Sequence, residues 1–361
     1  MIQGLLIQSL LVFPSEFEIL ENIIPFNKEK PFSLGLSHSR FDDSLDILNY
    51  SDKLKSTKPV KASTDNVYLS YVYKKLKFTY EYSDSSGTVT RSTQPFSLKT
   101  NVDSDSFFIG YNFFQNESRS YELSIFSREE KQDPLVIDCY AFGNTVLGGS
   151  CEEAKVRSLN SEIYKSTGEL VYEPVLRLSG DSDTQGIVLR ITSKSLGLLN
   201  FNHSFTFTNS TINQSFQSNI LNTTDQFIRN TIIEGQNAGE LLDRFKNELP
   251  QRTPWKENTF KYSVGNLIPL GDNFAFSGMY TFIKVNRNDY LNNPNKEDFT
   301  KNHVMDLFLF YGLSNYGTFY VKVSAFSNYL LGVNPLAYNR RSNHLFDHPY
   351  GQINAGLIFN F

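Results

Sequence analysis

The chain has 361 residues, a formal net charge of −4 and an isoelectric point of about 5.8. Acidic and basic residues are interspersed without a basic run, which excludes the usual electrostatic surface for nucleic acid. No stretch approaches the ~18 apolar residues of a membrane-spanning helix. Aromatic residues make up 14% of the chain, with 31 Phe and 20 Tyr, and this content favours strands over helices.

The first thirty residues are expected to be an export signal or another N-terminal segment. Leu5 to Phe13 is a short apolar run like the hydrophobic region of a signal peptide. No Lys or Arg precedes this run, and no cleavage site of small residues follows at Pro14–Ser15. We favour a misassigned start that omits a basic region, and the alternative is that the run belongs to the mature protein. Residues 31–361 are predicted to form one domain.

Beyond this segment, apolar and polar side chains alternate along short stretches that polar connections separate. Leu76–Tyr82 and Thr318–Ala325 alternate without interruption. Strands of this kind have one wet face and one apolar face. The pattern fits either a β-sandwich, in which apolar faces meet, or a membrane barrel, in which they meet lipid.

In chain order, the first strand is predicted at Phe32–Arg40. A long connection at Phe41–Asp65 follows, and a tight turn is expected at Lys74-Lys75. A further strand is placed at Leu135–Phe142, and Gln115–Ser118 is assigned to the outer end to keep short and long connections alternating. The other central connections are placed at Gln132–Pro134, Gly143–Lys155, Lys165–Gly168, Ser179–Gly186 and Ser193–Gly197.

The only two cysteines, Cys139 and Cys151, flank the Gly-rich stretch Gly143–Gly149. In an exported chain, such a pair favours a local disulfide, and the alternative is two unrelated thiols. Closing a loop this short stabilises a fold by roughly 3 kcal/mol.

The stretch from Asn209 to Lys256 interrupts the alternation and is predicted to be an outer loop containing a helix. Asp225 is suited to cap a turn that carries Phe227, Ile228, Ile232 and Ile233. Between Glu240 and Leu249, apolar residues recur at helical spacing: Leu241, Leu242, Phe245 and Leu249. We favour packing on the loop itself or on a neighbouring protomer, and the alternative is a loop that narrows the barrel mouth.

The last third of the chain alternates short and long connections without a break. Tight turns at Leu270–Asp272 and Ser314–Gly317 alternate with long connections at Arg287–Asn302 and Gly332–Pro349; the strands between them are Asn273–Val285, Val304–Gly312, one from Thr318, and Tyr350–Phe361. Membrane barrels alternate short periplasmic turns with longer outer loops, and a sandwich has no reason to do so. We therefore predict an all-β, transmembrane, antiparallel up-and-down barrel of about 16 strands, with about 14 as the alternative.

The chain ends in a strand with an aromatic last residue. Alternate apolar positions run to the terminus: Ile353, Ala355, Leu357, Phe359 and Phe361. This pattern resembles the terminal β-signal of Gram-negative outer-membrane β-barrels, which the barrel-assembly machinery reads as a strand edge. The resemblance implies insertion into the outer membrane, contact with its lipid and a closed barrel, and it implies no substrate.

Charged residues on the wet strand faces are the candidate site residues. They are Lys77, Glu81, Glu122, Glu173, Arg177, Arg190, Lys261, Asp306 and Lys322. On a lipid-facing surface each would cost ~2–4 kcal/mol near the midplane, so we expect them to face the lumen. Two interpretations stay open: they keep the lumen wet, or rows of opposite sign select small polar solutes.

Catalytic and metal-binding motifs are weak. The chain contains neither a G-x-S-x-G nor an H-E-x-x-H motif. His344 and His348 flank Asp347, but Pro349 argues against the helix that a metal site at this spacing needs. We therefore expect no catalytic residues, no metal and no cofactor.

The leading hypothesis is a porin-like passive channel for small hydrophilic solutes across the outer membrane. The alternatives are a surface or assembly barrel that binds another macromolecule, an outer-membrane enzyme of hydrolase type, and a transporter of hydrophobic compounds. Assembly into a homo-oligomer is left open.

Overall fold

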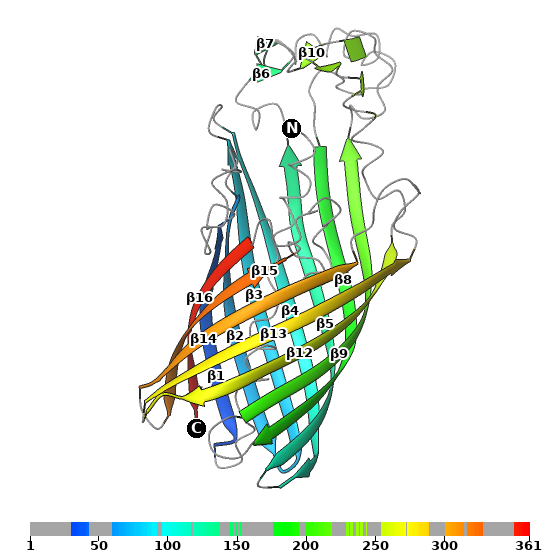
Figure 1. Ribbon diagram of the computed structural model, residues 1–361. Coiled ribbons are helices and arrows are strands. Elements are labelled where there is room, and N and C mark those ends of the chain that lie inside the picture. Colours follow the sequence, from blue (N-terminus) through cyan, green and yellow to red (C-terminus); the bar gives the residue numbers. More distant parts are fainter. Residues whose placement is uncertain are drawn as a thin grey trace.

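Twelve long strands form one closed antiparallel barrel in the computed structural model (Figure 1). The structure describes residues 30–42, 60–91, 96–116, 118–137, 145–146, 149–150, 152, 176–194, 200–218, 229–230, 232–233, 236–237, 239–240, 243, 254–271, 273–288, 300–313, 316–327 and 350–361. No helix among these residues is long and apolar enough to cross a membrane.

Neighbouring strands of the barrel are neighbours in the chain, and β1 closes the ring by pairing with β16. The barrel strands are β1 (Phe32–Asp42), β2 (Val60–Tyr73), β3 (Leu76–Arg91), β4 (Phe96–Gln115), β5 (Arg119–Ile137), β8 (Leu176–Lys194), β9 (Asn200–Ser218), β12 (Trp255–Pro269), β13 (Phe274–Asn288), β14 (Lys301–Gly312), β15 (Gly317–Phe326) and β16 (Tyr350–Asn360). Two short pairs lie outside the ring, β6 (Thr145–Val146) with β7 (Gly149–Ser150) and β10 (Ile232–Ile233) with β11 (Gln236–Asn237).

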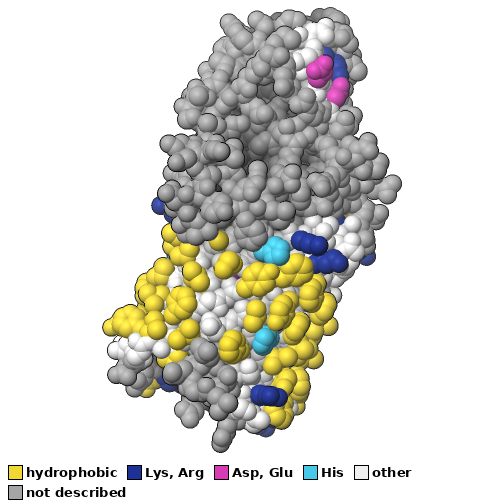
Figure 2. Space-filling view, viewed as in Figure 1, with side chains coloured by type: hydrophobic (Ala, Val, Ile, Leu, Met, Phe, Trp, Pro, Cys, Tyr) yellow, Lys and Arg dark blue, Asp and Glu magenta, His cyan; other side chains and the backbone are white. Residues whose placement is uncertain are grey.

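Alternation along each strand separates two surfaces. One set of alternate residues is buried and mostly polar, and the other carries exposed apolar side chains. Tyr80, Phe107, Ile187, Phe207 and Leu307, for example, are 40–58% exposed. On the face displayed in Figure 2, hydrophobic side chains, in yellow, cover much of the described barrel wall. An apolar exterior around a polar interior is the arrangement of a barrel that sits in lipid.

The short connections lie at one end of the barrel. The predicted turn at Lys74-Lys75 is confirmed, with Lys74 at φ 58°, and Gly271 at φ 116° lies in the predicted turn after β12. Both termini of the ring meet at this end, where the Phe361 N–H donates to the Phe32 carbonyl at 2.8 Å. In outer-membrane barrels this is the periplasmic end.

The strand number of about 16 was wrong, since the ring has twelve strands. Two of the predicted connections are parts of strands, which accounts for part of the difference. Gln132 pairs with Gly180, and Glu130 pairs with Ser182, so the stretches at Gln132–Pro134 and Ser179–Gly186 lie side by side in β5 and β8. The register shifts between Gln132 and Leu135. A bulge accommodates Pro134, which has no N–H to donate to a ladder.

The assignment of Gln115–Ser118 to the outer end was also wrong. It lies beside the turn after β2, because the Asn112 N–H donates to the Lys75 carbonyl at 2.8 Å. Asn116 makes this connection tight, since its side-chain oxygen accepts hydrogen bonds from the N–H groups of Ser118 and Arg119 at 3.0 and 2.6 Å. The consecutive strands β3, β4 and β5 therefore each cross the barrel from one end to the other.

The predicted helical insertion is not seen in the described part of the chain, where the helical residues of this stretch are Arg229, Asn230, Gly239, Glu240 and Asp243. Ile232 and Ile233 form β10 and pair with Asn237 and Gln236. Asn209 to Ser218, which we placed in the insertion, belongs to β9. Leu241, Leu242, Phe245 and Leu249 lie outside the described residues.

Several other expectations also fall outside the described residues. These are the N-terminal segment up to residue 29 and both cysteines, Cys139 and Cys151. The export signal and the disulfide therefore stay predictions.

Candidate functional site

The interior of the barrel is the candidate site, because it gathers most of the buried polar side chains. Ser, Thr, Asn and Gln provide much of its surface, as at Thr64, Asn66, Ser277, Asn302 and Asn354, all at most 3% exposed. They belong to the set of alternate residues that is buried along each strand, and side chains at alternate positions of a strand point to the same side of the sheet. These side chains therefore face the inside of the barrel.

One row of polar residues follows the hydrogen-bonded register across seven consecutive strands. The row runs from β3 to β13 through Glu81, Ser106, Arg128, Thr184, Ser210, Glu257 and Arg287. Within it, Arg128 Nε donates to Ser106 Oγ at 2.9 Å, and Arg287 Nε donates to Glu257 Oε2 at 2.8 Å. Charges of opposite sign therefore alternate around this half of the interior.

A second charged group lies closer to the short-turn end, where β5 pairs with β8. Arg190 Nη1 contacts Glu122 Oε1 at 2.7 Å, and their side chains are only 7% and 11% exposed. Ser124 Oγ donates to the same carboxylate oxygen at 2.8 Å and accepts from Arg190 Nη1 at 3.0 Å. Gly110 leaves room for this group, since a Cβ there would lie 2.8 Å from Glu122 Oε1.

Two further carboxylates are held by serines. Ser182 donates to Glu130 Oε2 at 2.7 Å, and Ser324 donates to Asp306 Oδ1 at 2.5 Å. Lys322, one strand from Asp306, lies with its Nζ 5.9 Å from the ring centre of Phe308. Each bond satisfies one oxygen of a carboxylate that the surrounding wall removes from water.

The structure places most predicted site residues at strand positions whose side chains point into the barrel. We call these positions the inward parity and the alternate positions the outward parity. Lys77, Glu81, Glu122, Arg190, Asp306 and Lys322 are buried, and Lys261 is half-buried. Arg177 requires a correction: it is exposed, because even-numbered residues of β8 face inward. Glu173 lies outside the described residues.

Sequence reasoning missed four interior charges, Arg128, Glu130, Glu257 and Arg287. Arg128 and Glu130 lie on the same side of β5 as Glu122, at even-numbered positions. The sequence did not predict them as lumen-facing because Gln132–Pro134 resembles a turn, and the strand was predicted to end before it. Among the inward side chains that the structure describes, basic and acidic residues are nearly equal in number. The basic ones are Lys77, Arg128, Arg190, Lys261, Arg287 and Lys322, and the acidic ones are Glu81, Glu122, Glu130, Glu257 and Asp306.

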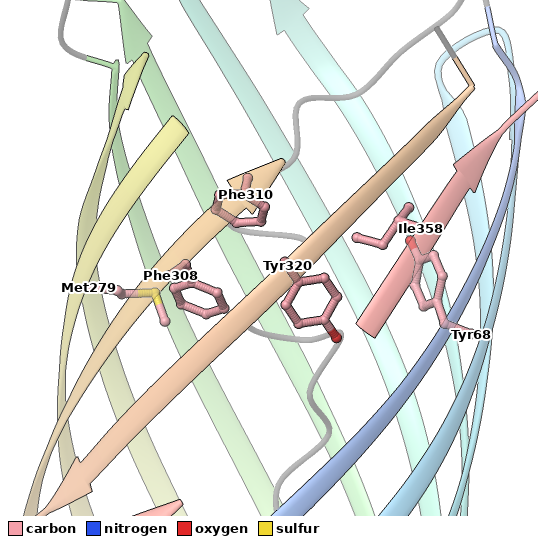
Figure 3. Packing of buried hydrophobic residues seen from close by; sticks show 6 residues of the cluster. All are labelled: Tyr68, Met279, Phe308, Phe310, Tyr320 and Ile358. Carbon is pink, nitrogen blue, oxygen red and sulfur yellow. The ribbon is translucent and has the colours of Figure 1, made fainter. Parts of the chain in front are cut away.

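The opposite part of the interior wall is apolar near the short-turn end. Figure 3 shows the buried cluster of Tyr68, Met279, Phe308, Phe310, Tyr320 and Ile358, contributed by β2 and β13 to β16. The rings of Phe308 and Phe310 are stacked at 5.6 Å. Tyr320 lies against Gly356, where a Cβ would come within 2.5 Å of the tyrosine oxygen.

Many interior side chains have little exposed surface. Ser277, Ser324 and Asn354, for example, are at most 1% exposed.

Metal ligands do not gather in the part of the chain that the structure describes, where no group of three or more His, Cys, Asp or Glu has suitable spacing. His344, Asp347 and His348 lie outside it. His203 and His303 are on the outward parity, each with a ring nitrogen at hydrogen-bond distance from a tyrosine oxygen, 3.0 Å for Tyr262 and 2.6 Å for Tyr280.

No protein-family model matches the chain, and no curated protein matches it in sequence. Its structure is similar to the translocator domain of the autotransporter NalP from Neisseria meningitidis, with a TM-score of 0.52, 9% identity and coverage of 95% of this chain and 92% of that one. Lower TM-scores of 0.44 relate it to the transport unit of the autotransporter AIDA-I from Escherichia coli, at 8% identity and 94% and 92% coverage, and to the toluene transporter TodX from Pseudomonas putida, at 11% identity and 98% and 95% coverage.

At 9% identity, the likeness to the NalP domain shows a shared fold and nothing about activity. The closed ring, its apolar exterior and its polar interior agree with that likeness. The chain therefore has the fold of a bacterial outer-membrane β-barrel, as its strand pattern and terminal β-signal led us to expect.

Proposed function

We propose that the chain is a passive channel for small hydrophilic solutes across the outer membrane. The observation that carries this proposal is the polar inner wall, in which charges of opposite sign alternate along the row from Glu81 to Arg287. A wall of hydroxyls, amides and paired charges replaces part of the hydration shell of a polar solute.

The low exposure of the inner wall bears on how such a channel would conduct. Ser277 and Asn302, on β13 and β14, have no exposed surface. We therefore expect conductance in brief steps instead of a steady open level.

The apolar cluster around Phe308 favours a second candidate, a route for hydrophobic compounds. Six buried side chains on five strands form this surface within the barrel. A hydrophobic solute would gain from contact with it, whereas a sugar or an ion would gain from the charged row instead.

Planar-bilayer recording of the refolded chain tests the proposal. We expect stepwise openings in KCl and, in liposome-swelling assays, uptake of small sugars. Insertion verified by protease protection, but without openings or swelling, would contradict a channel for hydrophilic solutes. Uptake of a hydrophobic fluorescent dye without sugar uptake would favour the second candidate.

A further inference from the structure

The outer surface of the barrel contains a groove of about 1050 Å³ that the channel proposal does not use. It lies across β4, β5, β8, β9, β12 and β13, and its lining residues are mainly those of the outward parity. A membrane barrel normally presents a convex surface to lipid, so a hollow on this side is a distinct binding surface.

The floor of the groove is one apolar row. The Cα register pairs Ile109 with Ile125, Ile125 with Ile187, Ile187 with Phe207, and Phe207 with Phe260. Ile125, Ile187 and Phe207 are 50–58% exposed, and the rings of Phe207 and Phe260 lie 5.0 Å apart. This row offers contact area for acyl chains.

Two cations continue the row at its end. Lys284 is the Cα partner of Phe260 on one side and of Lys301 on the other. Both lysines are exposed. Each lysine near the membrane surface attracts anionic lipid.

A polar row borders the apolar one on the side of the long connections. Its members are Ser127, Gln185, Asn209, Asn258 and Asn286, which are paired in register. Asn209 Nδ2 donates to Asn258 Oδ1 at 2.7 Å. On the face displayed in Figure 2, Lys and Arg side chains likewise lie at the upper border of the yellow hydrophobic surface. This border is where lipid head groups meet a barrel.

We propose that the groove binds an anionic, phosphate-bearing lipid of the outer leaflet. Its acyl chains lie on the apolar row from Ile109 to Phe260, and its phosphate lies between Lys284 and Lys301. The amides of the polar row hydrogen-bond to the glycerol or sugar part of the head group. Charge complementarity selects an anionic lipid over a zwitterionic one.

Native mass spectrometry of the detergent-solubilised full chain, titrated with phosphatidylglycerol or phosphatidylcholine, tests this site. We expect one phosphatidylglycerol to bind preferentially and the Lys284→Gln/Lys301→Gln double variant to bind it about tenfold more weakly. Ile187→Ser, in the apolar floor, should also weaken binding. Lys256→Gln is the matched control, because Lys256 is an exposed lysine of β12 whose Cα partner is Asn288, away from the pair of Lys284 and Lys301.

Three results would overturn the proposal. The first is equal binding by the double variant and the unaltered chain, and the second is equal affinity for both lipids. The third is loss of the bound lipid on addition of inorganic phosphate, which would identify a site for the free anion. If the double variant does not fold, the binding of phosphatidylglycerol by Ile187→Ser and the comparison of the two lipids test the proposal instead.

Discussion

Buried ion pairs are costly to break, and the pair between Glu122 and Arg190 lies deep in the interior. We predict that Glu122→Gln lowers the free energy of unfolding by about 3–5 kcal/mol, because Arg190 keeps its charge and loses the carboxylate. Urea titration in lipid vesicles measures the loss through the fluorescence of Trp255, the single tryptophan, which is 2% exposed.

The Glu122→Gln/Arg190→Gln double variant is expected to recover much of this loss, because no unmatched charge remains. Asp65→Asn is the control, since Asp65 contacts His38 at 2.8 Å in a largely exposed pair and its loss should change stability little. Strictly additive effects of the two interior substitutions would contradict the coupling.

A glycine in β8 makes a second prediction at this scale. A Cβ on Gly186 would lie 2.2 Å from the ring of Phe126, which stacks on Phe108 at 4.9 Å. We expect Gly186→Ala to destabilise the barrel by about 1–3 kcal/mol and Phe126→Leu to relieve part of that loss. Gly278→Ala should be much milder, because a Cβ there would lie 3.7 Å from its nearest neighbour, Asn266 Oδ1. Equal losses at both glycines in the same urea titration would argue against the clash.

At the scale of strands, sequence reasoning succeeded where both ends of a strand carry clear signals. The turn around Gly271 and the connection at Ser314–Gly317 bound β13 to β15 almost at the predicted residues. One face of these short strands is exposed and apolar along most of its length, so alternation is visible throughout.

The middle of the barrel could not be predicted in the same way. β5 and β8 have 19 residues each and extend beyond β13 to β15, as Figure 1 shows. Where a strand passes beyond the apolar surface, both of its faces are polar, as in Glu129–Gln132. Alternation then disappears, and a hydrophilic strand resembles a loop.

The terminal strand carries a prediction about assembly. Phe361 is 55% exposed and contacts Phe32 with a ring-centre distance of 6.2 Å, so its side chain contributes little to the finished interior. If the barrel-assembly machinery reads this residue, Phe361→Ser should lower the amount in outer-membrane fractions while stability after refolding in detergent changes little. Equal losses in both measurements would mean that the substitution destabilises the folded barrel instead of impairing its recognition during assembly. Ile353→Ser, at an outward position within β16, is the control variant.

At the scale of the whole molecule, the inner wall has two sides. Charged rows cover β3 to β13, and the cluster around Phe308 covers β13 to β16 with β2. A solute that crosses the barrel therefore meets a row of alternating charges on one side and, on the other, a hydrophobic surface with the Asp306 and Lys322 charges on the same strands. Since inward acids and bases nearly balance, the proposed channel should distinguish weakly between cations and anions.

Changing the sign of one interior charge should reveal that balance. Lys261 is the best position, because it is half-buried on the inward parity of β12, whereas Lys322 is 1% exposed. We predict that Lys261→Glu shifts the reversal potential in a KCl gradient toward cation permeation, since the added carboxylate attracts cations and repels chloride along the path. Lys256→Glu makes the same change in charge on the outward face of the same strand and should leave the reversal potential nearly unchanged. Equal shifts in both variants would mean that surface charge, and not the barrel interior, sets the selectivity.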